Sequence, residues 1–313
     1  MSVLVVGDAN VDLEIRLPVE AEPRVHANPD PRLLGGGSAA NTAVALARLD
    51  VACRFVGTVG DDSFGRFAMD SLREAGVDAD EVRATPDLST VTVITVTQPS
   101  GERLIYTWPP TGGAHGALLE DAAVRAVTGA QWLHISGICL RTTPSRYALL
   151  GAMEQARANG VPVSFDLNLR LENWGWDGGF RGIAEAAVER SDVVLGAATD
   201  EITALAGIDD PVDAALSLAG DGRLVIARLG ADGAVACSDE GVTTVPGFRV
   251  AVVDTVGAGD AFDAGFIASR LRGSDVATSL KWGNAAAALT ISRPGARSSP
   301  TLTELEVLLA GEV

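Results

Sequence analysis

The stretch VVDTVGAGDAFDAGF, residues 252–266, combines residue types that suit anion binding and proton transfer. Gly257, Ala258 and Gly259 stand directly before Asp260, where a segment with helical periodicity begins. Backbone N–H groups at a helix start converge on an anion, and the helix dipole favours negative charge there. A carboxylate beside such a site can accept the proton of an attacking hydroxyl in phosphoryl transfer. The stretch therefore predicts an anion site with a catalytic base, and a tight turn with an N-capping aspartate is the simpler alternative.

A second glycine cluster, LLGGGSAANTAVALARL, covers residues 33–49. Its glycines let the backbone approach a ligand closely, Ser38 can cap the following helix, and Asn41 then lies in the first turn with its amide directed at the ligand. A flexible loop with a helix cap is the alternative. Gly35, Gly37 and Ala40 formally fit the G-x-G-x-x-A pattern, but we expect no strong strand before them, which disfavours dinucleotide binding. The sequence contains no G-x-x-x-x-G-K-[ST] motif, which excludes a P-loop kinase.

The overall charge and composition narrow the possible partners. The formal net charge is −17, and a field of this sign repels nucleic acid and anionic membranes, so we expect neither as a partner. No apolar run reaches the length of a membrane span, and the N-terminal apolar run lacks a basic flank, which predicts a buried strand and not a signal peptide. The 3 cysteines are scattered through apolar segments, which favours a reducing cytoplasm over a disulfide framework.

Short apolar runs alternate with helical periods along most of the 313 residues. Strands separated by helices of this length form right-handed crossovers, which predicts a mostly parallel sheet covered on both faces. We expect strands at 3–7, 51–59, 132–137, 161–167, 192–196 and 223–230, and helices at 41–49, 64–76, 144–160 and 180–190.

Two insertions depart from this alternation. Residues 12–34 are rich in proline and charge, and residues 89–108 alternate Thr, Val and Ile around a turn near Gly101. The second pattern is typical of an antiparallel hairpin with one solvated face. We expect the two insertions to form a small β-sheet lid that projects from a core made of residues 1–11, 35–88 and 109–313.

These motifs together resemble a known family. DTVGAGDAFDAGF is similar to the C-terminal signature of the ribokinase-like (PfkB) carbohydrate kinases, and GGSAANTAVALARL is similar to their N-terminal signature. GDANVD, SGERLIYTW and RPGARSSPT follow in the family's order, so the resemblance covers nearly the whole chain. It implies an α/β fold of the ribokinase-like three-layer α/β/α type with a small β-sheet lid. It also implies transfer of the γ-phosphoryl group of ATP, with Mg²⁺, to a hydroxyl of a small sugar or sugar acid such as 2-keto-3-deoxygluconate, fructose or ribose.

The resemblance also assigns roles to individual residues. Asp260 matches the catalytic base, and the turn before it matches the anion hole for the transferring phosphoryl group. The residues matching the sugar-binding groups are Asn10, Asp12, Gly36, Gly37 and Asn41. For Asn10 and Asp12, a turn after the first strand is the alternative. The residues matching the nucleotide site are Glu201, Arg228, Gly230 and Asn284. A monovalent cation such as K⁺ is implied beside the anion hole, at Asp254, at carbonyls near Val256, Arg293 and Gly295, and at the Ser299 hydroxyl.

The sequence departs from the family in the nucleotide site. Ala198 stands where the family often has the asparagine of N-x-x-E, while Glu201 is present and can still organise Mg²⁺ through water. Arg228 stands where ribokinases tend to have threonine. We expect it either to supply a cation to the phosphates or to be a surface charge.

The sequence indicates the substrate less clearly than it indicates the family. The segment SFDLNLRLENW resembles the 2-keto-3-deoxygluconate kinase and fructokinase branches, and it places Asp166, Asn168 and Arg170 on the ligand side. Arg170 could then meet a carboxylate or a sugar oxygen. Trp108 could stack on a sugar or base face, or seal the core of the lid.

Two other functions remain open at this point. A nucleoside kinase of the same family would favour aromatic stacking in the lid. The sequence has only 2 tyrosines and 8 phenylalanines, which makes a nucleoside kinase less favoured. A catalytically silent sugar-binding or regulatory protein is the other, and the presence of Asp260 with its glycines argues against it. An exposed β-lid commonly pairs with its twin, which predicts a homodimer through the lid.

Overall fold

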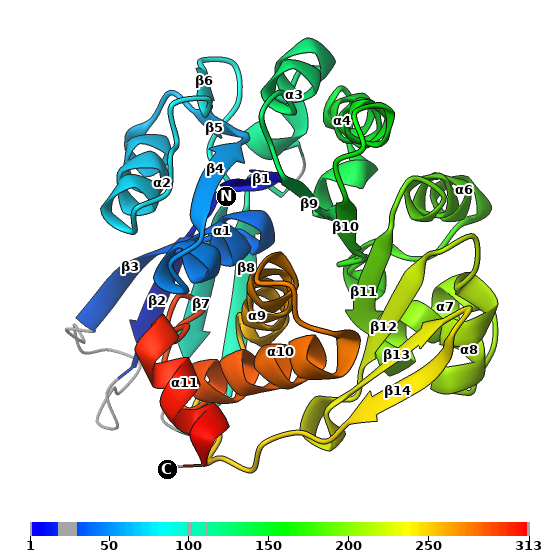
Figure 1. Cartoon of the computed structure of the whole chain (residues 1–313). Coiled ribbons are helices and arrows are strands. Elements are labelled where there is room, and N and C mark those ends of the chain that lie inside the picture. The colour runs from blue at the N-terminus through cyan, green and yellow to red at the C-terminus, as the bar shows by residue number, and fades with distance from the viewer. Residues whose placement is uncertain (1, 18–29, 99, 101, 111, 312–313) are drawn as a thin grey trace.

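The computed structural model describes residues 2–17, 30–98, 100, 102–110 and 112–311. Within these residues an eight-stranded sheet forms the centre of the molecule, in the order β14-β13-β12-β11-β10-β9-β1-β4 (Figure 1). Strands β12 to β4 in this order run parallel, and β13 and β14 are antiparallel additions at one edge. The bounds are β1 (Ser2–Val6), β4 (Ala52–Val56), β9 (Trp132–Ser136), β10 (Val163–Asp166), β11 (Val193–Ala197), β12 (Leu224–Arg228), β13 (Ala234–Ser238) and β14 (Gly241–Val245). The mostly parallel sheet is confirmed.

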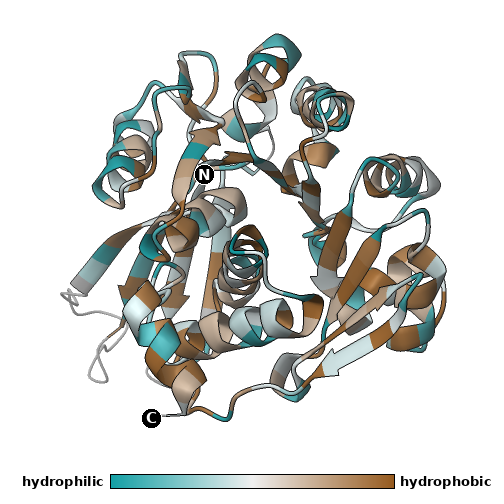
Figure 2. Cartoon of the chain, viewed as in Figure 1, coloured by the Kyte–Doolittle hydropathy of each residue, from teal (hydrophilic) through white to brown (hydrophobic). Residues whose placement is uncertain are grey.

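Helices cover both faces of the sheet because successive strand residues point to opposite sides. Val3 and Val5 pack into one apolar cluster, which the first helical layer covers, and Leu4 and Val6 pack into a second cluster on the other face. The strands at the centre of the sheet are accordingly mostly hydrophobic in Figure 2, while the edge strand β14 is paler. The first layer contains α1 (Ser38–Arg48), α2 (Ser63–Glu74), α9 (Ala258–Leu271), α10 (Val276–Ile291) and α11 (Leu302–Ala310). The second contains α3 (Glu120–Ala126), α4 (Ser145–Ala158), α6 (Gly178–Val188), α7 (Thr203–Ala206) and α8 (Pro211–Leu218). The three-layer prediction is confirmed.

A separate small sheet lies beside the core, in the order β3-β2-β7-β8 (Figure 1). It consists of β3 (Asp30–Gly36), β2 (Asn10–Arg16), β7 (Thr92–Thr97) and β8 (Arg103–Trp108). Strands β7 and β8 form the predicted antiparallel hairpin, with Thr92 opposite Trp108. The small sheet predicted from the two insertions is therefore confirmed, while the turn residue Gly101 and residues 18–29 lie outside the described residues.

The structure corrects two expectations about strands. The segment 51–59 is not one strand, because β4 ends at Val56 and Thr58–Gly60 forms β5, which pairs with β6 (Arg83–Thr85). Gly57 makes the break, where a Cβ atom would lie 2.6 Å from the Gly7 carbonyl oxygen. The second glycine cluster does follow a strand, since β3 runs directly into Gly36. That strand is an edge of the small sheet, a place where its proline is tolerated, so it does not form a dinucleotide-binding unit.

Helices α1 and α9 lie side by side over the sheet and begin at the same end of the molecule (Figure 1). Helix α9 is buried from Ala261 to Ser269, and Gly265 lets it approach α10 closely, since a Cβ atom there would lie 2.8 Å from the Trp282 carbonyl oxygen. In open α/β sheets, ligands bind outside the carboxyl ends of the strands. The two helix starts lie at that end. Among the described residues, the apolar helices are each too short to cross a bilayer.

Candidate active site

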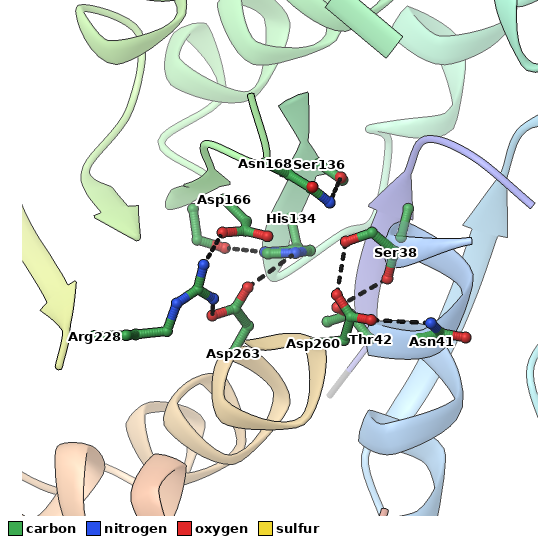
Figure 3. A network of polar contacts seen from close by, with 12 residues as sticks. Ser38, Asn41, Thr42, His134, Ser136, Asp166, Asn168, Arg228, Asp260 and Asp263 are labelled. Atoms are coloured by element: carbon green, nitrogen blue, oxygen red, sulfur yellow. Dashed lines mark hydrogen bonds and ion pairs between the residues drawn. The ribbon is translucent and has the colours of Figure 1, made fainter. Parts of the chain in front are cut away.

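Asp260 lies in the first turn of α9 and faces the first turn of α1 (Figure 3). Its Oδ1 atom accepts a hydrogen bond of 2.6 Å from the Ser38 hydroxyl, and its Oδ2 atom accepts one of 2.9 Å from the Asn41 amide nitrogen. The helix begins after Gly257, whose φ is 81°, and a Cβ atom there would collide with the backbone of Ala296. The predicted anion-hole turn and the carboxylate are therefore next to each other, with the carboxylate held at both oxygens.

The surroundings tune the carboxylate of Asp260. Burial raises its pKa to about 6, the hydrogen bonds from Ser38 and Asn41 oppose this rise, and the carboxylates of Asp166 and Asp8 add to it. A general base works best with a pKa near the operating pH. A pKa in this range suits the role of a base that the sequence predicts for Asp260.

Ser38 does not cap α1 as expected, because its hydroxyl is bonded to Asp260. The cap comes instead from Asp8, whose carboxylate accepts hydrogen bonds from the backbone N–H groups of Ser38 (3.0 Å) and Ala39 (3.2 Å). A carboxylate at a helix N-terminus is stabilised by the free N–H groups and by the dipole. Sequence reasoning missed Asp8, although its position in GDANVD, directly after the first strand, was a usable signal.

The predicted sugar-binding residues come together beside Asp260. Asn10 and Asp12 lie within strand β2, so the alternative of a turn after the first strand is wrong. Burial raises the pKa of Asp12 to about 6, although the nearby positive charge of Arg297 acts to lower it. A Cβ atom on Gly36 would lie 2.6 Å from Asp12 Oδ2, which explains the glycine opposite this carboxylate.

Asn10 and Gly37 complete this part of the site. The Asn10 amide nitrogen lies 3.4 Å from Asp8 Oδ2, and its buried Oδ1 atom has no hydrogen-bond partner among the described residues. Gly37 has φ 96°, and a Cβ atom there would lie 2.6 Å from the Asp8 carbonyl oxygen. The buried, unpaired Asn10 Oδ1 atom lies beside carboxylates and beside glycine backbone that has no side chain. This arrangement suits a ligand that donates hydrogen bonds, such as a polyol.

Arg297 is a second residue that sequence reasoning missed. Its guanidinium donates hydrogen bonds to Asn41 Oδ1 (3.1 Å), Ser71 Oγ (2.7 Å) and the Gly36 carbonyl oxygen (3.0 Å). Burial lowers its pKa to about 10 while nearby carboxylates oppose this, so it stays charged at neutral pH. The available signal was an arginine inside the RPGARSSP motif, although its partners lie far away in sequence.

Arg228 lies between carboxylates on three elements, and its side chain is 16% exposed, so the surface-charge alternative is wrong. It donates hydrogen bonds to Asp263 Oδ1 (2.9 Å) and Asp166 Oδ1 (2.7 Å), as Figure 3 shows. The Glu201 Oε2 atom is 3.9 Å from the guanidinium. Burial lowers the pKa of Arg228, but the three carboxylates raise it above its ordinary value. A Cβ atom on Gly259 would lie 3.0 Å from Arg228 Nη1, so the cation lies directly behind the anion-hole turn.

Glu201 connects the ends of two neighbouring strands. Its Oε1 atom accepts a hydrogen bond from Leu169 N (2.7 Å), and its Oε2 atom accepts one from Ala197 N (2.8 Å). Burial and the negative charge of Asp166 raise its pKa. Ala198, where the family often has asparagine, is buried. The structure thus brings Glu201 and Arg228 together at the predicted nucleotide site.

The other two predicted nucleotide residues lie on different elements. Gly230 follows β12 with φ 62°, and open space surrounds the position of its missing side chain. The Asn284 amide, on α10, donates hydrogen bonds to the carbonyl oxygens of Val245 (3.1 Å) and Pro246 (3.2 Å). Asn284 therefore holds the chain that leaves β14.

The segment after β10 turns sharply. Asp166 faces Arg228, the Asn168 amide nitrogen donates to Ser136 Oγ (3.3 Å), and both Asn168 and Arg170 have positive φ, 38° and 49°. Arg170 is exposed and precedes the short helix α5 (Leu171–Trp174). Trp108, on β8, is 57% exposed, so its expected alternative role of sealing the core of the small sheet is wrong.

The predicted cation loop is assembled around Asp254. Its Oδ1 atom accepts a hydrogen bond from Val256 N (3.3 Å), and its Oδ2 atom accepts one from Gly295 N (3.2 Å). The Arg293 side chain pairs with Glu304 at 2.7 Å, which leaves only its backbone for the predicted role. Ser299 is buried, and its hydroxyl has no hydrogen-bond partner among the described residues. The Asp254 carboxylate and the orphaned Ser299 hydroxyl are oxygen donors of the kind that a hard cation prefers.

Comparisons with known proteins show the family of the chain. Residues 1–303 match the family described as "pfkB family carbohydrate kinase". The chain is 36% identical to an ATP-dependent ribose-1-phosphate kinase of Halopiger xanaduensis, over 98% of each chain, and 34% identical to a fructokinase of Vibrio alginolyticus, over 97% of each. It is also 34% identical to an aminoimidazole riboside kinase of Salmonella typhimurium, over 95% of this chain and 91% of that one.

Solved structures show the same fold. A putative ribokinase II of E. coli superposes with a TM-score of 0.88 at 25% identity, over 99% of each chain. A fructokinase of Xylella fastidiosa with bound ATP gives 0.87 at 26% identity, over 99% of this chain and 98% of that one. A double mutant of a Vibrio cholerae fructokinase, with fructose, ADP and a potassium ion bound, gives 0.80 at 30% identity, over 98% of each.

The raised pKa of Asp260 predicts an acidic limb in the pH profile of turnover. A base must be deprotonated to act, so kcat/KM is expected to be full well above pH 6 and to fall about tenfold per pH unit well below it. The measurement is initial rate against pH at low acceptor concentration, with protein folding checked at each pH. An acidic limb near pH 4, the ordinary range of an aspartate, would contradict the burial effect.

Proposed function

Because this chain belongs to the pfkB family of carbohydrate kinases, we propose that it uses Asp260 to phosphorylate a hydroxyl of a small sugar or sugar acid with ATP. One observation carries the assignment of the base. The Asp260 carboxylate is held by the Ser38 hydroxyl and the Asn41 amide and follows the Gly257–Gly259 turn in the first turn of α9. A carboxylate with a raised pKa beside the N–H groups of a helix start supports the proposal of a proton acceptor next to an anion site.

The proposed reaction follows from that arrangement. Asp260 accepts the proton of the acceptor hydroxyl as its oxygen attacks the γ-phosphorus of ATP in line with the leaving ADP. The N–H groups of Gly257, Ala258 and Gly259 stabilise the charge on the transferring phosphoryl group. Arg228 adds positive charge from behind this turn while its carboxylate partners keep it in place.

The nucleotide is assigned to the end of the sheet that carries Glu201, Arg228 and Gly230, with Asn284 supporting the chain beside it. Asp166, Glu201 and Asp263 surround the single guanidinium of Arg228, so carboxyl groups outnumber cationic groups in this corner, where burial raises the pKa of Glu201 and Asp263. Such a corner fits Mg²⁺, which enters with ATP and neutralises charge on the phosphates. Glu201 would hold it through water, since both of its carboxylate oxygens already accept backbone hydrogen bonds.

The acceptor sugar is assigned to the residues around Asp260. Asn10, Asp12 and Asn41 supply amide and carboxylate groups for hydroxyls, and Gly36 and Gly37 leave the space that the sugar occupies. Trp108 and Arg170, both exposed, are the proposed outer contacts. The free, buried cysteines Cys53, Cys139 and Cys237 support a reducing cytoplasm as the compartment.

A nucleoside is the second candidate acceptor. Two observations favour it, the exposed ring of Trp108 and the likeness to a relative named aminoimidazole riboside kinase. A coupled ADP-release screen over sugars, sugar acids, sugar phosphates and nucleosides separates the candidates, because a specific kinase gives a kcat/KM at least tenfold higher for one class. Absence of ADP release with every class, from folded protein, would instead favour a silent binding protein.

The substitution Asp260→Asn tests the base directly. We expect kcat to fall about 10²–10⁴-fold with a small change in the KM for sugar, because the proton acceptor is lost while the binding groups remain. Asp210→Asn, at the N-cap of α8, is a matched control that should keep wild-type turnover. Near-wild-type kcat in Asp260→Asn would remove this residue from the mechanism.

Potassium should activate the enzyme if the Asp254 loop holds a monovalent cation beside the anion hole. The loop that carries Asp254 leads directly into the Gly257 turn, so ordering it should raise kcat. The measurement is a KCl titration in sodium-free buffer at fixed Mg²⁺, with tetramethylammonium chloride keeping the ionic strength constant. A flat titration, or the same response in Asp254→Asn, would count against the site.

The small sheet is proposed to close over the sugar with one face and to pair with a second copy through β8. Its outer strand exposes Ile105 (65%), Tyr106 (56%) and Trp108. Water must be excluded during transfer, so hydrogen exchange in residues 10–16 and 92–97 should slow on adding sugar. Exchange in residues 103–108 should also slow as protein concentration rises. If hydrogen exchange in residues 10–16 and 92–97 does not respond to a true substrate, the small sheet does not close over the sugar. If exchange in β8 is independent of protein concentration, β8 does not pair with a second copy.

A further inference from the structure

We propose that Arg297 is a positioning residue, which acts through Asn41 to keep the Asp260 carboxylate aimed at the acceptor hydroxyl. The inference rests on the proposed role of Asp260 as base. It is carried by a continuous chain of hydrogen bonds. Arg297 Nε donates to Asn41 Oδ1 at 3.1 Å, and Asn41 Nδ2 donates to Asp260 Oδ2 at 2.9 Å.

The chain of hydrogen bonds fixes which way the Asn41 amide points. An amide has an acceptor oxygen at one side and a donor NH₂ at the other. If the amide were reversed, its oxygen would face the Asp260 carboxylate and its NH₂ would face the Arg297 guanidinium, so both contacts would be repulsive. The guanidinium therefore selects the orientation in which Asn41 donates to the base.

The guanidinium is itself held rigidly, as a positioning group must be. It also bonds Ser71 Oγ on α2 at 2.7 Å and the Gly36 carbonyl oxygen at the end of β3 at 3.0 Å. A Cβ atom at Gly35 would collide with Arg297, so the glycine cluster provides the space for this side chain. Arg297 thus ties the loop after α10 to the glycine cluster and to α2, in addition to the base.

The charge of Arg297 acts in the same direction as its geometry. The carboxylates of Asp8, Asp12 and Asp260 all interact electrostatically with the guanidinium. Asp166 on β10 also disfavours a negative charge on Asp260, but it is bonded to Arg228. Asp263 on α9 interacts with Asp260 too and is likewise bonded to Arg228. Removing the Arg297 guanidinium leaves Asp8, Asp12 and Asp260 without its compensating charge, which should raise the pKa of Asp260.

The test compares Arg297→Gln and Arg297→Lys with Arg54→Gln. Arg54 is a matched control, because it is a half-buried arginine bonded to the carbonyl oxygens of Ala126 and Thr128. We expect kcat of Arg297→Gln to fall about 10-fold or more, and the acidic limb of kcat/KM to move up by about 0.5–1 pH unit. Lysine keeps the charge but not the planar three-way geometry, so Arg297→Lys should keep the wild-type limb and lose part of kcat. Arg54→Gln should change neither.

A double-mutant cycle identifies the route of the effect. If Arg297 acts through Asn41, the drop in kcat caused by Arg297→Gln should shrink to about twofold in an Asn41→Ala background, because the intermediary is already gone. The same cycle with Arg297→Lys serves if the glutamine variant does not fold. Rates are referred to the folded fraction, measured by thermal unfolding.

Three results separate failure of this inference from failure of the base assignment. An unmoved acidic limb together with unchanged kcat in Arg297→Gln overturns the role of Arg297. An equal loss of kcat in the wild-type and Asn41→Ala backgrounds also overturns it. If Asp260→Asn keeps its turnover, the base assignment is wrong whatever the Arg297 variants do.

Discussion

The contact between the first turns of α1 and α9 is the interaction on which the site depends. The bonds from Ser38 and Asn41 to Asp260 join segments more than 200 residues apart in sequence, and they do so where two helix N-termini converge. Both macrodipoles present their positive ends to this region, which helps to stabilise the carboxylate and, in the proposed reaction, the transferring phosphoryl group. Helix α9 can hold this position because it is buried along most of its length against α1 and α10.

A site with so many buried carboxylates needs compensating groups, and the structure supplies them in two places. Arg297 compensates beside Asp8, Asp12 and Asp260, on the proposed acceptor side. Arg228 compensates on the proposed nucleotide side, where it bonds both Asp166 and Asp263. Behind Asp263 lies His134, 4.0 Å away, whose pKa burial lowers to about 4, so it is neutral at physiological pH (Figure 3). Removing one partner of a buried charge pair is strongly destabilising because the other charge is left uncompensated. The hydrogen-bonded charges around Arg228 and Arg297 therefore also hold the surrounding elements together.

The parts of the site that could be predicted from sequence are those coded by neighbouring residues. The turn and base at 257–260 form one local motif, and the mostly parallel sheet follows from the alternation of apolar runs and helical periods. Asp8 and Arg297 could not be placed in the same way, because their partners lie 30 and 256 residues away and only folding brings them together. Strand β3 was not recognised as a strong strand because it contains a proline and an arginine, both of which an edge strand tolerates. The sequence predicted that the Ser38 hydroxyl caps the following helix, but it donates to Asp260, which lies 222 residues away and is brought close only by folding.

The most direct test of the account is a crystal structure of the protein with its sugar, ADP, Mg²⁺ and tetrafluoroaluminate, which mimics the transferring phosphoryl group. If the 257–259 turn is the anion site, the fluoride ligands lie within hydrogen-bond distance of the N–H groups at Gly257–Gly259. If Asp260 is the base, the acceptor hydroxyl lies about 2.6–3.2 Å from an Asp260 oxygen, and Asn41 stays bonded to both Asp260 and Arg297. An acceptor hydroxyl that points away from Asp260, or an aluminium fluoride bound outside the 257–259 turn, would contradict it.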